Sequence, residues 1–173
     1  MSADTREDIL ERLYALLGSV SGIMSVWRDR GELPNQSELP AAFLLDGGEK
    51  LFSEVAEMKF IIMPSAIMTM SAFIGLVIYP RDSKSNLTVN QIPVNTGAEL
   101  SGWRNKIIDA VVNDPQLVSI VGGIGGSGRG GTGQIIYRGM DTDMQPGGEM
   151  MGTLVTHWEF RYVLPILRPQ TFD

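Results

Sequence analysis

The sequence has no cysteine and only one histidine among its 173 residues. These absences exclude disulfide bonds, thiol catalysis, thiolate metal sites and any multi-histidine metal site within the chain. Charged residues make up only 20% of the chain, and the formal net charge is −6. Because proteins bind nucleic acid mainly through lysine and arginine contacts to phosphates, this balance disfavours tight binding of nucleic acid as the main role.

The composition is that of an ordinary globular protein. Hydrophobic residues account for 43% of the chain, which is long enough to bury one core, so we expect a single domain over residues 1–173. The first eight residues are charged and lack the apolar core of a signal peptide. We therefore expect the protein to be made in a cytoplasm.

The longest uncharged stretch, residues 60–80, is the main structural signal. As a helix it would be long enough to cross a membrane, since about 20 apolar residues suffice. A period of two fits better, because side chains alternate across a sheet and every second residue here is apolar. The sequence therefore predicts a strand at residues 65–79, with a membrane helix as the alternative. Its apolar face comprises Ala66, Met68, Met70, Ala72, Ile74, Leu76 and Ile78.

The length of this strand has a consequence for assembly. Residues 65–79 would span roughly 50 Å at about 3.3 Å per residue, more than a small domain needs. Either the strand breaks near Ser71 or Gly75, or it extends past its own core and pairs with other backbone. We expect the second case, with neighbouring copies of the chain as the partners.

Two helices are predicted from apolar residues at helical spacing. Residues 5–17 begin at a capping box formed by Thr5 and Asp8. The second helix begins at Thr96 and stops before Pro115, because proline cannot continue a helix.

Shorter signals complete the predicted fold. We expect strands at residues 23–30, 40–46, 134–138 and 151–164, a turn at 46–48 and a loop at 141–149. We also expect all three tryptophans in the core. The fold class is then α+β: a mostly antiparallel sheet, two main helices packed on one face, and long strands that extend toward neighbouring subunits.

A glycine-rich run at residues 122–133 contains the letters G-x-G-x-x-G at 123–128. A dinucleotide site needs a helix after these glycines to hold the pyrophosphate, but a predicted strand follows instead. We interpret the run as a flexible loop that orders against a partner, with Arg129 as its charged contact. A nucleotide-binding enzyme built on this loop is the less favoured alternative.

No set of residues points to catalysis. His157 is predicted on the outward face of the last strand beside Glu159 and Arg161, where contact with a partner is the simpler interpretation. Asp141 and Asp143 resemble the start of a calcium loop but lack its later residues, so we interpret them as a turn. We expect no cofactor, no metal and no enzymatic activity. The candidate contacts with other subunits or partners are Met68, Met70, Phe73, Arg129, His157, Glu159 and Arg161.

The order of the short motifs is similar to that of a known family. Trp103-Arg104, a helix, Asn113-Asp114-Pro115 and an aromatic last strand follow one another, after an amino-terminal helix, Val26-Trp27-Arg28 and Asp46-Gly47-Gly48-Glu49. This order resembles the tail terminator proteins of long-tailed bacteriophages. The resemblance covers nearly the whole chain and rests on the order and spacing of its motifs.

The resemblance implies a non-enzymatic ring, of six copies, located in the tail or neck of the virion and assembled in the host cytoplasm. Such a ring caps the tail tube protein, offers a docking surface to head-completion or stopper proteins, and lets DNA pass through its centre. An acidic channel would help DNA to slide, because like charges make no counterion-releasing contacts. The alternative within this class is another neck or tube component: an adaptor, a stopper or a tube subunit.

Overall fold

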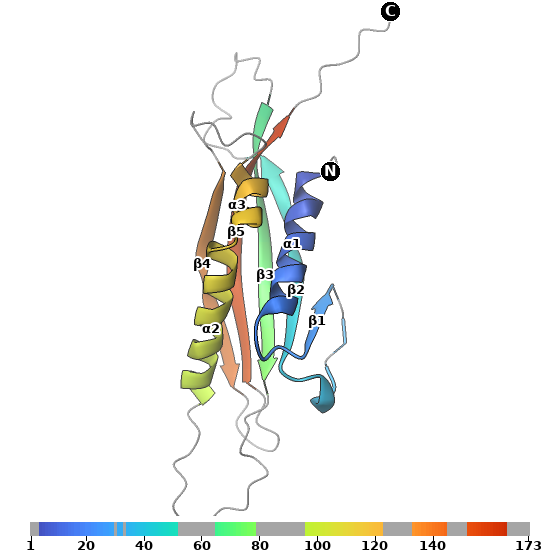
Figure 1. The fold of residues 1–173 in the computed structure, drawn as a ribbon, viewed down its shortest axis with the longest axis vertical. Helices are drawn as coiled ribbons and strands as arrows, with labels where there is room; N and C mark the ends of the chain where they lie inside the picture. The colour runs from blue at the N-terminus through green and yellow to red at the C-terminus, as the bar shows by residue number, and fades with distance from the viewer. Residues whose placement is uncertain are drawn as a thin grey trace, which may run out of the picture.

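The computed structural model describes residues 4–29, 31–32, 34–51, 65–78, 96–122, 133–144 and 152–165. These residues form three α-helices, a short 3₁₀ helix and five strands (Figure 1). In chain order the elements are α1 (Thr5–Ser19), β1 (Ser25–Arg28), η1 (Gln36–Glu38), β2 (Ala41–Leu51), β3 (Ser65–Ile78), α2 (Thr96–Val112), α3 (Pro115–Gly122), β4 (Gln134–Met144) and β5 (Gly152–Pro165).

The strands form one sheet in the order β1-β2-β3-β5-β4. Only β1 and β2 are parallel, and the other neighbouring pairs are antiparallel. The three helices lie over one face of this sheet (Figure 1). The predicted α+β class, with a mostly antiparallel sheet and the helices on one face, is therefore confirmed, and α3 is a third helix beyond the two predicted ones.

The central strand β3 confirms the strand predicted from alternation. It runs without a break past Ser71 and Gly75, and it pairs with β5 from Ser65 to Ile78. Its other edge pairs with β2 from Met68 to Val77. Because β5 is equally long, every described residue of β3 has a partner inside the chain on at least one edge. The prediction that the length of this strand also serves pairing with neighbouring copies stays a prediction.

A membrane helix is not found in this region. Residues 65–78 are extended, and in the part of the chain that the structure describes no helix is both long and apolar enough to cross a membrane.

The core lies between the helices and the sheet face beneath them. Apolar residues of all three helices pack on alternate residues of β3 and β5. Met70 is 0% exposed in this core, and Met68 packs against it while partly buried. Met70 is therefore a core residue, and its prediction as a partner contact is wrong because its face of β3 lies under the helices.

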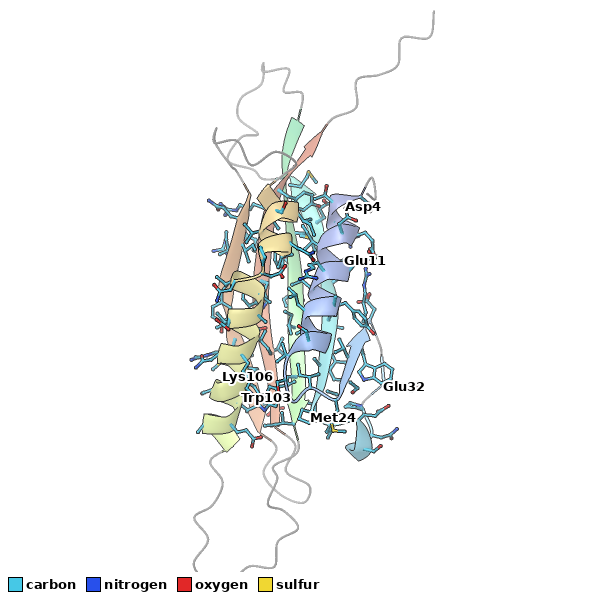
Figure 2. All side chains as sticks on the ribbon, in the orientation of Figure 1. Asp4, Glu11, Met24, Glu32, Trp103 and Lys106 are labelled. Atoms are coloured by element: carbon cyan, nitrogen blue, oxygen red, sulfur yellow. The ribbon has the colours of Figure 1, made fainter. Side chains whose placement is uncertain are left out.

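Trp103 of α2 and Trp158 of β5 both lie in this core, as predicted. Figure 2 shows Trp103 beside Lys106, whose ammonium lies 4.2 Å from the centre of the indole ring.

The N-cap of helix α1 lies one residue before the predicted cap. Asp4, rather than Thr5, is the N-cap, and its Oδ1 accepts hydrogen bonds from the backbone N–H groups of Arg6 and Glu7 at 3.0 and 3.2 Å. A carboxylate at this position also interacts favourably with the helix dipole, which explains why the aspartate is preferred to the neighbouring hydroxyl.

The predicted turn at residues 46–48 is a bulge inside β2. Asp46 pairs with Ala72 and Glu49 with Met70, so Gly47 and Gly48 lie opposite the single residue Ser71 and β2 holds one extra residue there. Gly48 has a φ of 87°, and its N–H donates to Asp46 Oδ1 at 2.9 Å. The Asp-Gly-Gly sequence therefore bends the strand without ending it, and the predicted end of this strand at Asp46 is wrong.

Replacing Gly48 with alanine should lower the free energy of unfolding by about 1–2 kcal/mol, because a Cβ disfavours the left-handed backbone. A Cβ at Gly48 would meet no atom within 4 Å, so backbone strain is the whole effect. Gly102, inside α2, also has open space and provides the matched control. Gly102→Ala should raise the free energy of unfolding by about 0.5–1 kcal/mol. Urea titration of both variants measures the two effects. Equal effects at the two positions would contradict this account of the bulge.

One further prediction differs from the structure, because residues 141–143 lie in β4 instead of a turn. Strand β4 continues because it resumes pairing with β5 after a bulge between Tyr137 and Gly139. The glycine-rich run from residue 123 to 132 lies outside the described residues, as does Arg129.

Candidate interface on the helix-free face of the sheet

The face of the sheet opposite the three helices carries a row of apolar side chains. We call this surface the helix-free face. Trp27 pairs with Phe43, and Leu45 pairs with Phe73, so these residues are cross-strand neighbours on β1, β2 and β3. Val155 continues the row onto β5 through its pairing with Gly75. We call these five side chains, Trp27, Phe43, Leu45, Phe73 and Val155, the apolar strip.

The apolar strip remains partly open to solvent within the single chain. Leu45 is 40% exposed, and the other four residues are half-buried. Trp27 and Phe43 pack on a small cluster formed by Leu39, Ala41 and Val77. The prediction that Trp27 lies in the main core is therefore wrong, because β1 turns this residue away from the helices.

His157 lies at the end of the apolar strip. Its ring contacts Phe73 edge-on, with the ring centres 5.1 Å apart, and the two residues pair across β3 and β5. His157 Nε2 lies 2.9 Å from Asp141 Oδ2 on β4. The imidazole therefore contacts both the apolar strip, through Phe73, and a carboxylate of the edge strand β4, through Asp141.

A charged cluster lies beside the apolar strip on β4 and β5. Glu159 accepts hydrogen bonds from Arg138, at 2.9 and 2.6 Å, and from Arg161 Nε at 2.9 Å. Arg161 also donates to Gln134 at 3.1 Å. Burial raises the pKa of Glu159, but the hydrogen bonds from the two arginines outweigh burial and lower the pKa below its usual value. Two guanidinium groups therefore share the carboxylate of Glu159, and two further carboxylates, those of Asp141 and Asp143, lie farther along β4.

Four of the seven predicted contact residues meet on this surface: Phe73, His157, Glu159 and Arg161. Met68 and Met70 lie on the opposite face of β3, and Arg129 lies outside the described residues. Sequence reasoning missed Phe43 and Leu45 as surface residues. The alternation in β2 marks its two faces, but the sequence alone does not say which face the helices cover.

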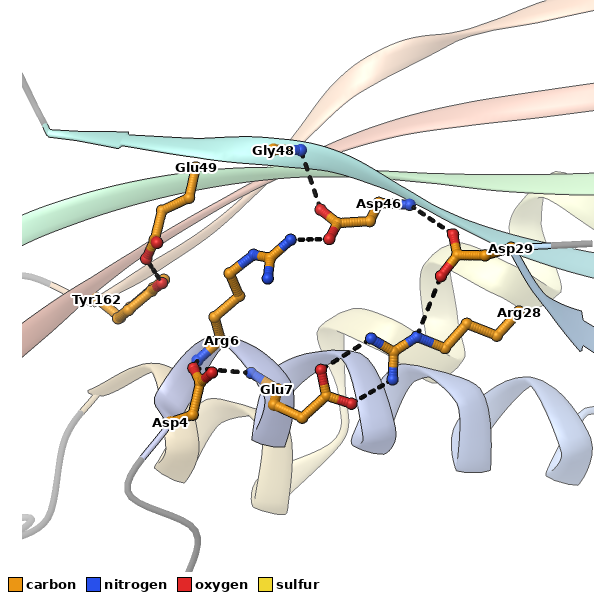
Figure 3. A network of polar contacts seen from close by, with 9 residues as sticks. All are labelled: Asp4, Arg6, Glu7, Arg28, Asp29, Asp46, Gly48, Glu49 and Tyr162. Atoms are coloured by element: carbon orange, nitrogen blue, oxygen red, sulfur yellow. Dashed lines mark hydrogen bonds and ion pairs between the residues drawn. The ribbon is translucent and has the colours of Figure 1, made fainter.

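A second feature is a shallow hollow between α1 and β1, lined by Glu11, Tyr14, Val26, Trp27 and Arg28. Between two of these lining residues, the hydroxyl of Tyr14 donates to the carbonyl of Val26 at 3.3 Å. Arg28 donates to both carboxylate oxygens of Glu7, which lowers the pKa of Glu7 (Figure 3).

Further polar contacts tie α1 and β5 to β2. Arg6 pairs with Asp46, and the hydroxyl of Tyr162 donates to Glu49 (Figure 3). Asp46 and Glu49 therefore support the bulge in β2 through their contacts with α1 and β5.

The described residues offer no group of three or more histidine, aspartate or glutamate side chains arranged to hold a metal ion. The strand that a dinucleotide loop requires before its glycines is also missing, because α3 ends at Gly122 directly before residues 123–128. The chain matches no protein-family model and no curated protein sequence. The helix-free face thus combines a partly exposed apolar strip with a neighbouring cluster of charged side chains.

Proposed function

We propose that this protein is a structural virion protein, a ring-forming tail terminator of a long-tailed bacteriophage. Six copies form a ring that caps the tail tube and offers a docking surface to head-completion proteins, and DNA passes through its centre. Two points support the proposal: the order of motifs along the chain, and the partly open apolar strip on the helix-free face.

The apolar strip is the observation that carries the proposal. Single exposed apolar residues are common, but a contiguous row across four strands marks a contact surface. The row is bordered by the cluster of Arg138, Glu159 and Arg161. An apolar centre with a charged rim is the usual composition of a protein interface. Such a surface serves assembly and requires neither a cofactor nor a catalytic residue.

The charge of the chain is compatible with DNA passing through a ring. The formal net charge is −6, so the ring as a whole carries an excess of carboxylates. Duplex DNA is held mainly by cationic contacts that release counterions, and an acidic ring makes few of them. Tight binding of the isolated ring to duplex DNA, weakening steeply with salt, would contradict this part of the proposal.

The proposal is tested by adding purified protein, carrying a small electron-dense label, to tail tubes assembled without it. We expect label at one end of each tube in negative-stain images and heads attached only to labelled tubes. Label distributed along the tube wall would indicate a tube subunit instead. Label bound to heads without tubes would indicate an adaptor or a stopper.

Phe73→Lys should abolish most capping while leaving the fold intact. Phe73 is half-buried at the centre of the apolar strip, and loss of a central aromatic contact commonly weakens an interface about thirtyfold. Val118→Lys is the matched control, because Val118 is 50% exposed on α3 in the helix layer. The measurement is the fraction of capped tube ends at increasing protein concentration, with thermal melting as the folding check. Equal capping by both variants would contradict the proposal that the apolar strip contacts the tail tube.

A further inference from the structure

The charged side chains of the helix-free face are sorted by their position along the strands. Thr69 of β3 pairs with Lys50 of β2 and with Arg161 of β5. Arg161 pairs in turn with Gln134 of β4. The next residue of β3, Met70, lies in the core, so this row of four residues lies on the helix-free face. The row contains two cations and no carboxylate, and we call it the cationic row.

One carboxylate lies close to the cationic row. Glu159 is two residues from Arg161 along β5, and it accepts hydrogen bonds from Arg161 and from Arg138. Glu49 belongs to the other face of the sheet, where it accepts the hydroxyl of the core residue Tyr162. Together with the cationic row, Arg138 makes three cations against one carboxylate among the described residues at this end of the face.

The opposite end of the face carries carboxylates. Asp141 pairs with Val155 and Asp143 pairs with Thr153, two and four residues along β5 from His157. Both aspartates are exposed, and the Asp141 side chain is 82% exposed. The described residues of the two rows that contain these aspartates include no lysine or arginine. This end is therefore negative, while the end at the cationic row is positive.

The apolar strip has its centre between the two charged ends. Phe73 lies four residues of β3 from Thr69 and four from Val77, which pairs with Thr153. At about 3.3 Å per residue, the cationic row and Asp143 are about 26 Å apart along the strands. This separation is about three Debye lengths at physiological ionic strength, so a partner meets the two ends as independent charges.

We propose that the helix-free face binds a protein surface of matching chemistry. This surface has a carboxylate opposite the cationic row, an apolar group opposite the apolar strip, and a lysine or arginine opposite Asp141 and Asp143. The proposal rests on the proposed function, in which the end of the tail tube is the partner, and adds the chemistry of that end. Reversal of the partner along the strands places like charges together, so the tube end docks in one direction only.

Two other occupants fit this face less well. Duplex DNA carries phosphates along its whole length, so it would meet Asp141 and Asp143 as well as the cationic row, and these carboxylates repel it. A second copy of the chain turned end for end also brings opposite charges together, but it covers the apolar strip that the proposed docking requires.

Charge reversal at each end tests the proposal in the tube-capping measurement. Lys50→Glu and Asp143→Lys, each alone, should raise the protein concentration for half-capping about fivefold at low salt. Because the two positions lie far apart, their effects should multiply to about twenty-five-fold in the double variant. Both losses should shrink in high salt, which screens exposed charges, whereas the loss caused by Phe73→Ala should persist.

Two variants of α2, in the helix layer, provide matched controls. Arg104→Glu changes the net charge by the same amount as Lys50→Glu, and Asp109→Lys matches Asp143→Lys. Both controls should cap tubes like the native chain, and melting temperatures identify any loss of folding. Lys50→Gln and Asp143→Asn remove each charge without reversing it and should give smaller losses of the same salt dependence.

The outcomes separate this inference from the proposed function. Capping by Lys50→Glu and Asp143→Lys at the native concentration would overturn the inference and leave the proposed function intact. Disulfide-linked dimers of Phe73→Cys, formed before tubes are added, would overturn it too. The native chain has no cysteine, and Phe73 meets itself when two copies pair end for end on this face. Failure of the native chain to cap tubes would overturn the inference together with the proposed function.

Discussion

Replacing Trp158 with alanine is expected to lower the free energy of unfolding by about 3–5 kcal/mol, the range found for large-to-small changes in buried cores. Trp158 is 1% exposed and contacts Tyr137 and Phe160, with ring centres 5.2 and 6.5 Å away. Its Nε1 donates to Thr156 Oγ1 at 2.9 Å, and that hydroxyl donates to the carbonyl of Ile74 at 3.1 Å. The alanine variant therefore loses core packing and one member of a buried hydrogen-bond chain.

Urea titration measures this loss. The slope of the unfolding free energy against urea concentration should be the same for the variant and the native chain. Trp27→Ala is the matched control, because Trp27 is half-buried on the helix-free face and should cost less than half as much. A loss below about 1 kcal/mol for Trp158→Ala would contradict its placement at the centre of the core.

Replacing Asp114 with alanine should lower the free energy of unfolding by about 2–4 kcal/mol, because it removes a helix cap and leaves a partly buried arginine unpaired. The Asp114 side chain is 6% exposed, and both of its oxygens accept hydrogen bonds from Arg12 of α1. Its Oδ1 also accepts the backbone N–H of Leu117 at 2.6 Å, at the start of α3. Asp114→Asn retains a capping oxygen without the charge and should cost less than the alanine variant.

The pH dependence of stability separates the charge of Asp114 from its capping role. The hydrogen bond from Arg12 lowers the pKa of Asp114 below its ordinary value of 3.8 more than burial raises it. A carboxyl group whose pKa is lowered by folding stabilises the protein above its unfolded pKa. This contribution is lost as the pH falls below 3.8 and through the folded pKa. Between pH 7 and pH 2, the melting temperature should therefore fall less for Asp114→Asn than for the native chain. An equal fall for both proteins would contradict the pairing of Asp114 with Arg12.

The regular elements of this fold could be predicted from the sequence because single periodicities dominate them. Every second residue of β3 from Ala66 is apolar, β5 follows the same period with few exceptions, and the apolar stripe through Trp103 and Ile107 marks α2. The features that sequence reasoning missed depend on neighbouring strands. Asp46-Gly47-Gly48 is a turn signal, but pairing on both sides of it with β3 turns it into a bulge.

The candidate site could be predicted only in part for a related reason. Alternation in β3 separates Met70 from Phe73, but the position of the helices decides which of them is buried. His157, Glu159 and Arg161 are polar residues in an otherwise apolar strand, so their outward position was visible in the sequence. Leu45 and Phe73 pair across two strands, and no pattern within either strand predicts that they are neighbours.

The most direct measurement of the central claim is the mass of the native protein in detergent-free buffer, followed by negative-stain imaging. The account predicts closed rings with a mass near six times that of the 18.9 kDa subunit. Monomers that persist at micromolar concentration, with no annular particles in the images, would contradict it.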